Sequence, residues 1–520
     1  MEDEERQKLL EENACLRAEI VLLKQTVDAL CRRIFGVKSE VLDPAQLELL
    51  LDPDALKKAA AAVPADPGPA AEILTHQRPA KKQARAPRIP AHLPVTEEKT
   101  IEPAEVLADP TAFRRIGEEV CERLHFKRGE FSRTRTIRPK YVRIGDALSK
   151  PLIAPLPPSL QDRCIATPAL IAEVLDNRFT RHLPYYRQAE MFSHLGVKLH
   201  RKTLCDWVLL ASDWLSILYR EIQYEHWRAR YRQIDETPIS YLAPGSGQAK
   251  TGYLWVSNIP GGSVLYHWRK GRDQGGITEL LGDAAHAAHA AHAGHAAGGD
   301  ARIIQCDGFS AYPSWAKNKP HVTLMGCHAH VRRKFFEAKD QSPRLVAWIL
   351  RQLAHLYQIE KQLRETQAGP ALREAARAAH SRPIHRRLKK LFHKLASRRT
   401  ILPKSNLGKA VSYALNQWPN LETYLSDGQV EIDNNLVENA IRPTKLGVKN
   451  WLFIGRETAG EKSAILYTLV ENCRRLGLNP RDYFEDVLTR LPGMKASEAA
   501  SLTPANWHQA LKQKQATRAA

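Results

Sequence analysis

Apolar residues recur with a seven-residue period over the first forty residues of the chain. Leucines stand every seven residues, and a β-branched residue or an asparagine follows each of them after four: Leu9, Asn13, Leu16, Ile20, Leu23, Val27, Leu30 and Ile34. These are the d and a positions of a coiled coil, and β-branched residues at a with Leu at d favour a parallel pair of helices. We therefore predict a dimerising coiled-coil helix over residues 1–40. The alternative is a single amphipathic helix that packs on its own protein.

The seven-residue period is lost after residue 40, and two segments of different composition follow. Residues 41–100 are rich in Ala, Pro and Lys, which predicts a linker. Residues 101–150 mix β-branched and basic residues, which predicts a small, half-exposed β element. The linker includes the basic residues Lys81, Lys82 and Arg85. They suit contact with a phosphate backbone, and a solvated tether is the alternative.

Residues 151–228 show a helical pattern with one interruption. The stretch "LPYYRQAEMFSHLGVKLHRKTLCDWVLLAS" predicts a helix, a break at Gly196, and a second helix that starts near His200. Arg201 and Lys202 stand in the first turn of that second helix. This is the outline of a helix-turn-helix whose second helix enters the major groove of DNA. An ordinary helical hairpin has the same pattern, so both interpretations stay open.

Short apolar strands dominate the next region. The stretches "YRQIDETPISYLAP", "GYLWVSNI" and "SVLYHWRKG" predict an antiparallel meander. "ARIIQCD" predicts a further strand that ends in Asp307, "HVTLMGC" another strand, and "HAHVRRKFFEAK" a basic helix. We assign residues 229–339 to the first part of an α/β core, 340–425 to a helical region, 426–492 to the last part of the core, and 493–520 to a flexible tail.

The balance of charge adds a partner to this picture. The chain has 77 Lys and Arg against 57 Asp and Glu, a net charge of +20, so we expect a polyanionic partner and nucleic acid first. A membrane surface also attracts such a chain, but no apolar run approaches the roughly 20 residues that span a bilayer. The acidic start "MEDEERQK" is not a signal peptide, and we expect a soluble, intracellular protein. The eight cysteines form no CxxC pair, which indicates reduced thiols.

A low-complexity stretch of Ala and His occupies residues 284–300. His286, His289, His292 and His295 recur every three residues, which on a helix forms a slowly drifting stripe able to bind a soft transition metal. The alternative is a mobile surface loop that grew by expansion of a repeat. No carboxylate or thiol is interleaved to complete a defined site, so no role is assigned to it.

Two acids stand at strand positions, Asp235 after "YRQI" and Asp307 after "RIIQC". Acids are depleted in strands and costly to desolvate, so the pair indicates either surface residues or a metal site. If neighbouring strands present both carboxylates on one face, and a helix adds a third, the set suits Mg²⁺, which takes few protein oxygens and leaves room for phosphate. Two such ions about 4 Å apart support an in-line phosphoryl transfer.

Candidates for the third acid lie in "EIDNNLVENAIRPTKLGVKNWLF", which starts at residue 431. Asp433 is placed to cap a helix that starts at Asn434 or Asn435. Glu438 lies about a turn inside this helix, where it either holds a metal or closes a capping box with Asn435. In the second case Arg442 is merely its partner four residues on. The spacing alone leaves both roles open.

Several of these stretches together resemble one known family. "QIDETPISYLAP", "QCDGFSAYPSW", "CHAHVRRKFFEA", "DNNLVENAIRPTKLG" and "HLPYYRQAEMFSHLGVKLHRKTLCDWV" resemble the transposase (TnpC) of the insertion sequence 66 family. The resemblance covers residues 10–490 in a single order. It implies an RNase H-like core of the DDE recombinase type, with Asp235, Asp307 and Glu438 as catalytic and metal-binding acids. The 131 residues from Asp307 to Glu438 then imply that the helical region 340–425 is an insertion.

The same resemblance implies cofactors, contacts and partners. We expect Mg²⁺ or Mn²⁺, two ions for a site. Basic residues near the acids and at the predicted recognition helix are expected to bind DNA phosphates: Arg332, Arg333, Lys334, Arg442, Lys445, Lys449, Arg201 and Lys202. Family members carry a small zinc element of CxxC pairs near "IGEEVCERLHF", but this chain has only Cys121 there, so zinc is not expected. We interpret Cys327 as a buried thiol and His328 as a histidine at a helix start.

These observations favour a DNA transposase that cuts the ends of an insertion sequence and joins the freed 3′-hydroxyl to target DNA. The alternatives are a non-catalytic DNA-binding protein derived from a transposase and a structure-selective nuclease of the same fold. The expected partners are transposon-end and target DNA, a second copy through the coiled coil, and accessory proteins encoded by the same element. We expect a bacterial cytoplasmic protein associated with the nucleoid.

Overall fold

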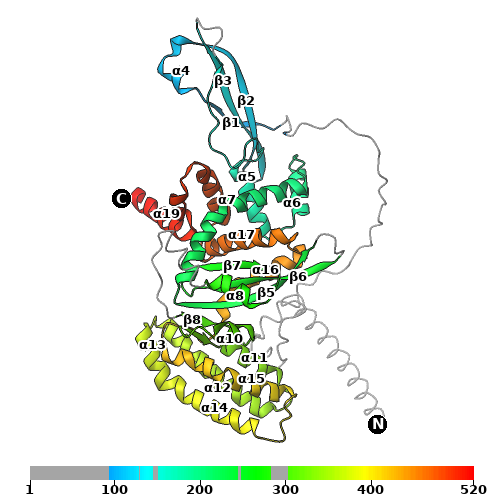
Figure 1. The fold of residues 1–520 in the computed structure, drawn as a ribbon, viewed down its shortest axis with the longest axis vertical. Coiled ribbons are helices and arrows are strands. Elements are labelled where there is room, and N and C mark those ends of the chain that lie inside the picture. The colour runs from blue at the N-terminus through cyan, green and yellow to red at the C-terminus, as the bar shows by residue number, and fades with distance from the viewer. Residues whose placement is uncertain are drawn as a thin grey trace, which may run out of the picture. The chain divides into compact units, whose positions relative to one another are not determined.

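The computed structural model describes residues 89, 93–127, 129–144, 150–243, 248–282 and 302–519. The predicted coiled coil, the basic residues of the linker and the His/Ala repeat lie outside the described residues, so these predictions stay predictions. Figure 1 shows the arrangement of the elements.

The first described unit is a small sheet. Its elements are β1 (Val95–Thr100), α4 (Ala104–Ala108), β2 (Phe113–Lys127), β3 (Glu130–Arg143) and β4 (Leu152–Ile153), with the strand order β1-β3-β2 and β4 beside β3. In the long β2–β3 hairpin the first half of β2 is mostly exposed and most of β3 is half-exposed, so a half-exposed β structure occupies the range in which the sequence predicted one. Strand β1 lies within residues 41–100, the range assigned to the linker, yet it belongs to this sheet because it pairs in parallel with β3. The β element therefore begins earlier than its composition predicts.

Three helices follow, with the predicted break between the last two: α5 (Pro168–Phe179), α6 (Tyr185–His194) and α7 (Arg201–Arg228). The break lies at Gly196, whose φ of +84° favours glycine. The helix–break–helix prediction is thus confirmed. The long helix α7 is also part of the hydrophobic core. Its apolar face, which includes Leu215 and Leu218, shares one hydrophobic cluster with the central sheet.

The central sheet has five strands in the order β7-β6-β5-β8-β9. The elements of this region are β5 (Tyr231–Leu242), β6 (Ala249–Asn258), β7 (Val264–Arg269), α8 (Gln274–Leu281), β8 (Arg302–Gln305), α10 (Ala311–Ala316) and β9 (Val322–Met325). The first three strands form the predicted antiparallel meander, and β8 and β9 run parallel to β5. One detail differs from the prediction. Strand β8 ends at Gln305, so Asp307 lies two residues beyond it.

Helices from the C-terminal part pack on the sheet and on α5 and α7: α16 (Asn435–Trp451), α17 (Glu457–Arg475) and α18 (Pro480–Arg490). The predicted flexible tail is wrong over most of its length, because residues 496–502 form a 3-10 helix and α19 spans Pro504–Ala519. Leu502 is fully buried, and the Trp507 indole N–H donates to the carboxylate of Asp486 over 2.7 Å. These contacts tie the start of α19 to α18.

The region between β9 and α16 is helical, as predicted, and forms a second hydrophobic cluster. It contains α11 (His328–Glu337), α12 (Pro343–Glu365), α13 (Pro370–Ala376), a π-helical turn (Arg377–Ser381), α14 (Arg382–Ala396) and α15 (Asn406–Glu422). We call α12 to α15 the helical insertion. Its cluster includes Tyr231, Ile303 and Met325, one residue from each of the three strands at the β9 end of the sheet. The insertion therefore packs on the same end of the sheet as the predicted acids.

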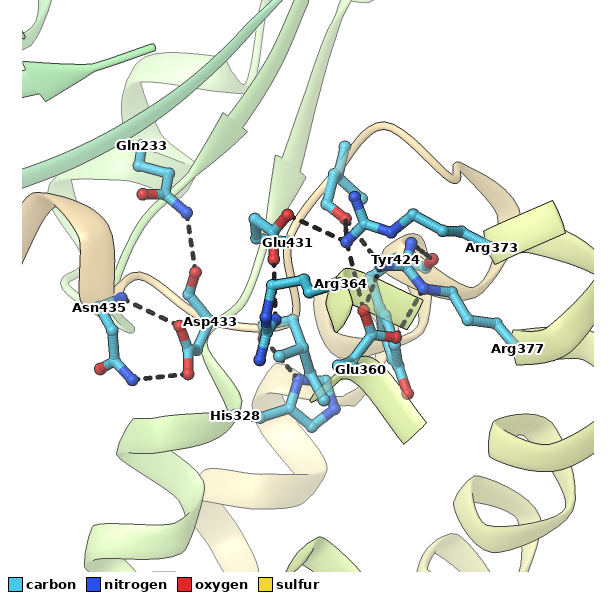
Figure 2. A network of polar contacts seen from close by, with 12 residues as sticks. Gln233, His328, Glu360, Arg364, Arg373, Arg377, Tyr424, Glu431, Asp433 and Asn435 are labelled. Carbon is cyan, nitrogen blue, oxygen red and sulfur yellow. Dashed lines mark hydrogen bonds and ion pairs between the residues drawn. The ribbon is translucent and has the colours of Figure 1, made fainter. Parts of the chain in front are cut away.

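A buried ion pair holds the insertion to the chain that enters α16 (Figure 2). The guanidinium of Arg377 donates to both carboxylate oxygens of Glu360 over 2.7 Å each, and neither side chain is exposed. It also donates to the backbone carbonyls of Tyr424, Asp427 and Val430 over 2.8–2.9 Å. Arg373 and Arg364 bind the Glu431 carboxylate. The segment that precedes α16 is thus fixed from the insertion side.

We predict that Arg377→Gln lowers the free energy of unfolding by about 3 kcal/mol, because it leaves the buried Glu360 carboxylate without its main partner. The matched control is Arg364→Gln, since Arg364 is half exposed and its ion pair with Glu431 is worth less than about 1 kcal/mol. Chemical denaturation followed by circular dichroism measures both. An equal loss of unfolding free energy in the two variants would contradict the larger contribution assigned to the buried pair of Arg377 and Glu360.

Candidate active site

The register of β5 and β8 brings the two strand acids to one edge of the sheet. The two strands are parallel, with Gln233 opposite Gln305. The side-chain amide of Gln233 donates to the side-chain oxygen of Gln305 over 2.9 Å, so both side chains lie on one face. Asp235 follows Gln233 by two residues on β5, so its side chain lies on the same face, because side chains alternate with a period of two along a strand. Asp307 lies two residues beyond the end of β8, so the register does not place its side chain, and the prediction that both acids lie together stays a prediction.

Buried polar groups hold the start of α16 against these strands. Gln233 donates to the Asp433 carbonyl over 2.8 Å, and Gln305 donates to the Glu431 carbonyl over 3.1 Å. In the reverse direction, the Asn434 amide donates to the Ile234 carbonyl over 2.8 Å. Gln233, Gln305 and Asn434 are fully buried, and we call these three residues the polar clamp. Figure 2 shows Gln233 pointing at Asp433.

The helix start resolves the two roles that spacing left open for Glu438. Helix α16 begins at Asn435, and Asn434 is its N-cap residue. Asp433 is therefore not the N-cap residue that the sequence predicted, but the residue before it. Its carboxylate still stabilises the helix start, because it accepts a hydrogen bond from the backbone N–H of Asn435 over 3.1 Å. A capping box is excluded, because Glu438 is the fourth helical residue and its buried Oε1 has no hydrogen-bond partner. Its ion-pair neighbours are His330 and Arg333, at 3.9 and 3.8 Å, rather than Arg442.

Electrostatics links the three predicted acids. The pKa of Asp235 is raised to about 8, mainly by burial and also by the neighbouring charges of Glu236, Asp307 and Glu438, against one opposing backbone hydrogen bond. Asp235, Asp307 and Glu438 therefore lie within electrostatic reach of one another, from β5, the end of β8 and α16. Acids that crowd together in this way need a cation to stay ionised.

The donor set fits a hard divalent cation. Asp235, Asp307 and Glu438 influence one another electrostatically, one oxygen of Glu438 is buried without a hydrogen-bond partner, and carboxylate oxygen is the ligand that Mg²⁺ and Mn²⁺ prefer. Among the described residues, the ligand atoms that lie within 4.8 Å of one another belong to a second group, which is Cys327, His330 and Glu438. In that second group Cys327 has another function: burial raises the pKa of its thiol to about 12, and its sulfur accepts the Asn434 N–H over 3.2 Å.

His328 and Cys327 have the roles predicted for them. Cys327 is buried and caps α11, and His328 is the first residue of that helix. His328 donates from Nδ1 to the Ile432 carbonyl over 3.0 Å, and burial lowers its pKa to about 4, so the ring is neutral. Both residues therefore hold the segment before α16. The six described cysteines are free thiols, which includes Cys121 in β2.

The sequence did not single out three further residues at or next to the site: His330, Arg272 and its partner Glu236. His330 lies beside Glu438, yet it is one of two histidines in "CHAH" and its spacing gave no reason to choose it. Arg272 pairs with Glu236, lies 3.8 Å from the Asp307 carboxylate, and stacks on Phe309. Glu236 follows Asp235 directly, so strand alternation places it on the opposite face, where the Tyr312 hydroxyl donates to it over 2.7 Å.

Two of the predicted phosphate-binding residues lie beside the acids. Arg333 neighbours Glu438, and the Lys445 ammonium is close enough to Asp235 for that charge to oppose the lowering of the Lys445 pKa by burial. The other predicted residues are exposed on α11, α16 and the first turn of α7: Arg332, Lys334, Arg442, Lys449, Arg201 and Lys202. The acids thus have cationic side chains at their border, as the sequence predicted for a site that binds phosphate.

Comparison with known proteins identifies the family. The chain matches the models described as "Transposase C of IS166 homeodomain" over residues 22–97, "Transposase IS66 family" over 163–462 and "IS66 C-terminal element" over 468–505. It is 32% identical over 507 residues to the uncharacterised protein y4jD of Sinorhizobium fredii, which covers 95% of this chain and 94% of the relative. A second uncharacterised protein of that organism, y4qI, is 32% identical over 454 residues, 82% of this chain and 79% of the relative. This chain belongs to the IS66 transposase family.

None of the helices among the described residues combines the length and the apolar character needed to cross a bilayer.

We predict that Asp235 makes the stability of the metal-free protein fall as the pH rises from about 4 to about 8. Its pKa is raised from 3.8 in the unfolded chain to about 8 in the fold, so the unfolded chain binds fewer protons across this window. The loss is at most about 1.4 kcal/mol for each pH unit. Thermal unfolding in EDTA at pH 5 and pH 8 measures it, with Asp235→Asn expected to reduce the dependence and Mg²⁺ to restore stability at pH 8. The same pH dependence in the parent and in Asp235→Asn would contradict this interpretation.

Proposed function

We propose that the protein is a DNA transposase whose strand cleavage and strand transfer depend on divalent ions held by Asp235, Asp307 and Glu438. Membership of the IS66 transposase family supports the activity. The observation that supports the assignment of residues is the environment of Asp235: burial raises its pKa to about 8, with contributions from the charges of Glu236, Asp307 and Glu438. We further propose that the mixed five-stranded sheet is an RNase H-like core.

The cofactor proposed for this site is Mg²⁺ or Mn²⁺, with two ions bound in each site. When bound, such ions activate the attacking oxygen and stabilise the leaving oxygen of a phosphoryl transfer. The chain's own contribution is positional. The polar clamp and the register of β5 and β8 hold three carboxylates in place, so that they need not reorganise during the reaction.

Cationic side chains at the border of the site bind the DNA backbone in this proposal. Arg333 of α11 lies beside Glu438, and Lys445 of α16 is within electrostatic reach of Asp235. A scissile phosphate brings further negative charge to this crowded site, and these cations offset it. Burial lowers the pKa of His330, so its imidazole is neutral at pH 7 and adds no charge beside Glu438.

We also propose that two copies act together, one for each transposon end, through the predicted coiled coil over residues 1–40. This segment lies outside the described residues, and its sequence pattern supports the proposal. The proposed site of action is DNA in the bacterial cytoplasm and nucleoid. Accessory proteins encoded by the same element are a further proposal that rests on the family alone.

The decisive test of the site is Glu438→Gln, which keeps the size of the side chain and removes its charge. We predict at least about a 100-fold loss of Mg²⁺-dependent cleavage of terminal-repeat DNA, with DNA binding in EDTA unchanged. Glu461→Gln is the matched control, because Glu461 is exposed on α17, and it should cleave as the parent does.

The other possible results select other functions. If Glu438→Gln loses DNA binding together with cleavage, the catalytic assignment fails. If the parent binds terminal repeats but neither cuts nor joins them with Mg²⁺ or Mn²⁺, the protein is a DNA-binding protein without catalysis. Cleavage without a product in which the 3′-hydroxyl is joined to target DNA identifies a nuclease.

A further inference from the structure

A strongly basic helix lies in the helical insertion, away from the residues assigned so far. Residues 375–421 contain eleven Lys and Arg and neither Asp nor Glu. Within this stretch five cations follow one another at a constant interval of four residues: Arg382, Arg386, Lys390, Lys394 and Arg398. Four of them lie on α14 and the last follows its C-terminus. Residues four apart share one face of a helix, so we call these five residues the cationic row.

The cationic row is exposed, and the opposite face of its helix is buried. All five side chains are exposed, whereas Ile384, Leu388 and Phe392 belong to the core of the insertion. Among the residues that the structure describes, no acid forms an ion pair with any member of the row. The nearest basic neighbour on the helix, Lys389, does have a partner, Glu422, at 3.1 Å. The row thus presents uncompensated charge to the solvent from a helix that is firmly packed.

The stability of the helix does not explain the row. Like charges four residues apart repel one another, and each such pair destabilises a helix. Helix α14 directly continues α13 and the π-helical turn, so Arg382 lies inside a longer helix and gains nothing from the helix dipole. Only the members near the C-terminus gain from that dipole. A repeated arrangement that costs stability, with no acid to offset it, indicates a polyanionic partner.

Spacing and composition favour the backbone of duplex DNA as this partner. Successive members lie about 6 Å apart along the helix axis, and the twelve steps from Arg382 to Lys394 span about 18 Å, roughly five base pairs of duplex at 3.4 Å each. Residues 382–399 include no Asn or Gln to read base edges, and their one Phe is buried and unable to stack on bases. A membrane surface fits less well, because an interfacial helix must insert the apolar face that α14 buries.

We propose that the cationic row binds the phosphate backbone of duplex DNA, without sequence preference, as a second contact separate from the acids. The proposal takes its ligand from the proposed function but does not depend on catalysis. Helix α14 is joined to the site through α11, since Phe335 of α11 stacks on Phe392 of α14 with ring centroids 5.0 Å apart. Helix α11 in turn carries Arg333 beside Glu438. DNA held by the row is therefore held by the same rigid unit that supports the acids.

The test compares two triple variants of the full chain that lose equal charge. One is Arg386→Gln with Lys390→Gln and Lys394→Gln. The other is Lys317→Gln with Lys512→Gln and Lys514→Gln, three exposed lysines on other elements. Binding to a labelled 30-base-pair duplex of arbitrary sequence is measured in EDTA over a range of salt concentrations. For the row variant we expect weaker binding, and a slope of log K against log salt reduced by about 2 to 3, as for the loss of three phosphate contacts.

The control variant should reduce the slope of log K against log salt by less than about 1, which is the change expected for the loss of one phosphate contact. The row variant should unfold at a temperature no lower than that of the parent, because the substitutions remove repulsion between like charges. Weak DNA binding by this variant then cannot be ascribed to misfolding. The proposal is overturned if the row variant keeps the parental slope, or if the control loses as much. It is also overturned if the row variant loses binding to phosphatidylserine vesicles while duplex binding is unchanged. Because no metal is present, none of these outcomes depends on the cleavage assigned to Asp235, Asp307 and Glu438.

Discussion

The candidate site depends on a few hydrogen bonds between buried amide side chains and the backbone that enters α16. Gln233 and Gln305 donate across the sheet to carbonyls of residues 433 and 431, and Asn434 donates back to residue 234. Each bond alone contributes only about 1 kcal/mol, but a buried amide left without a partner costs about 1–3 kcal/mol. Only the observed placement of α16 satisfies all three. The clamp therefore fixes Glu438 relative to the two strand acids, although no member of the clamp is an acid.

The helical insertion supports the same segment from the other side. Arg377 binds Glu360 and three backbone carbonyls in one buried group, and His328 binds the Ile432 carbonyl. A charged group is stable in such a place only when its hydrogen bonds are complete, so this arrangement tolerates little displacement. The insertion is thus a structural part of the site. The insertion separates Asp307 from Glu438 in the sequence, but in the fold it contacts the segment before α16 directly.

Much of the fold could be predicted from the sequence because its signals are local. Alternating apolar residues located the strands of the meander, and the helix–break–helix at Gly196 followed from a glycine and two periodic segments. The acids were proposed because carboxylates are rare in strands, and the family resemblance supplied their order. His330 and Arg272 were missed because their significance arises from contacts between distant segments. The helical end of the chain was missed because the sequence pattern of α19 shows little amphipathic character, and its order depends on Trp507 and Leu502.

The central claim is that Asp235, Asp307 and Glu438 form one divalent-metal site. It is tested most directly by anomalous diffraction at the manganese edge from crystals of the protein soaked in Mn²⁺. The account predicts anomalous peaks between the three carboxylates, with oxygen ligands from all of them and the polar clamp unchanged. The claim is contradicted if no peak lies among these acids, or if Mn²⁺ binds at Cys327 and His330 without contact to Asp235 or Asp307.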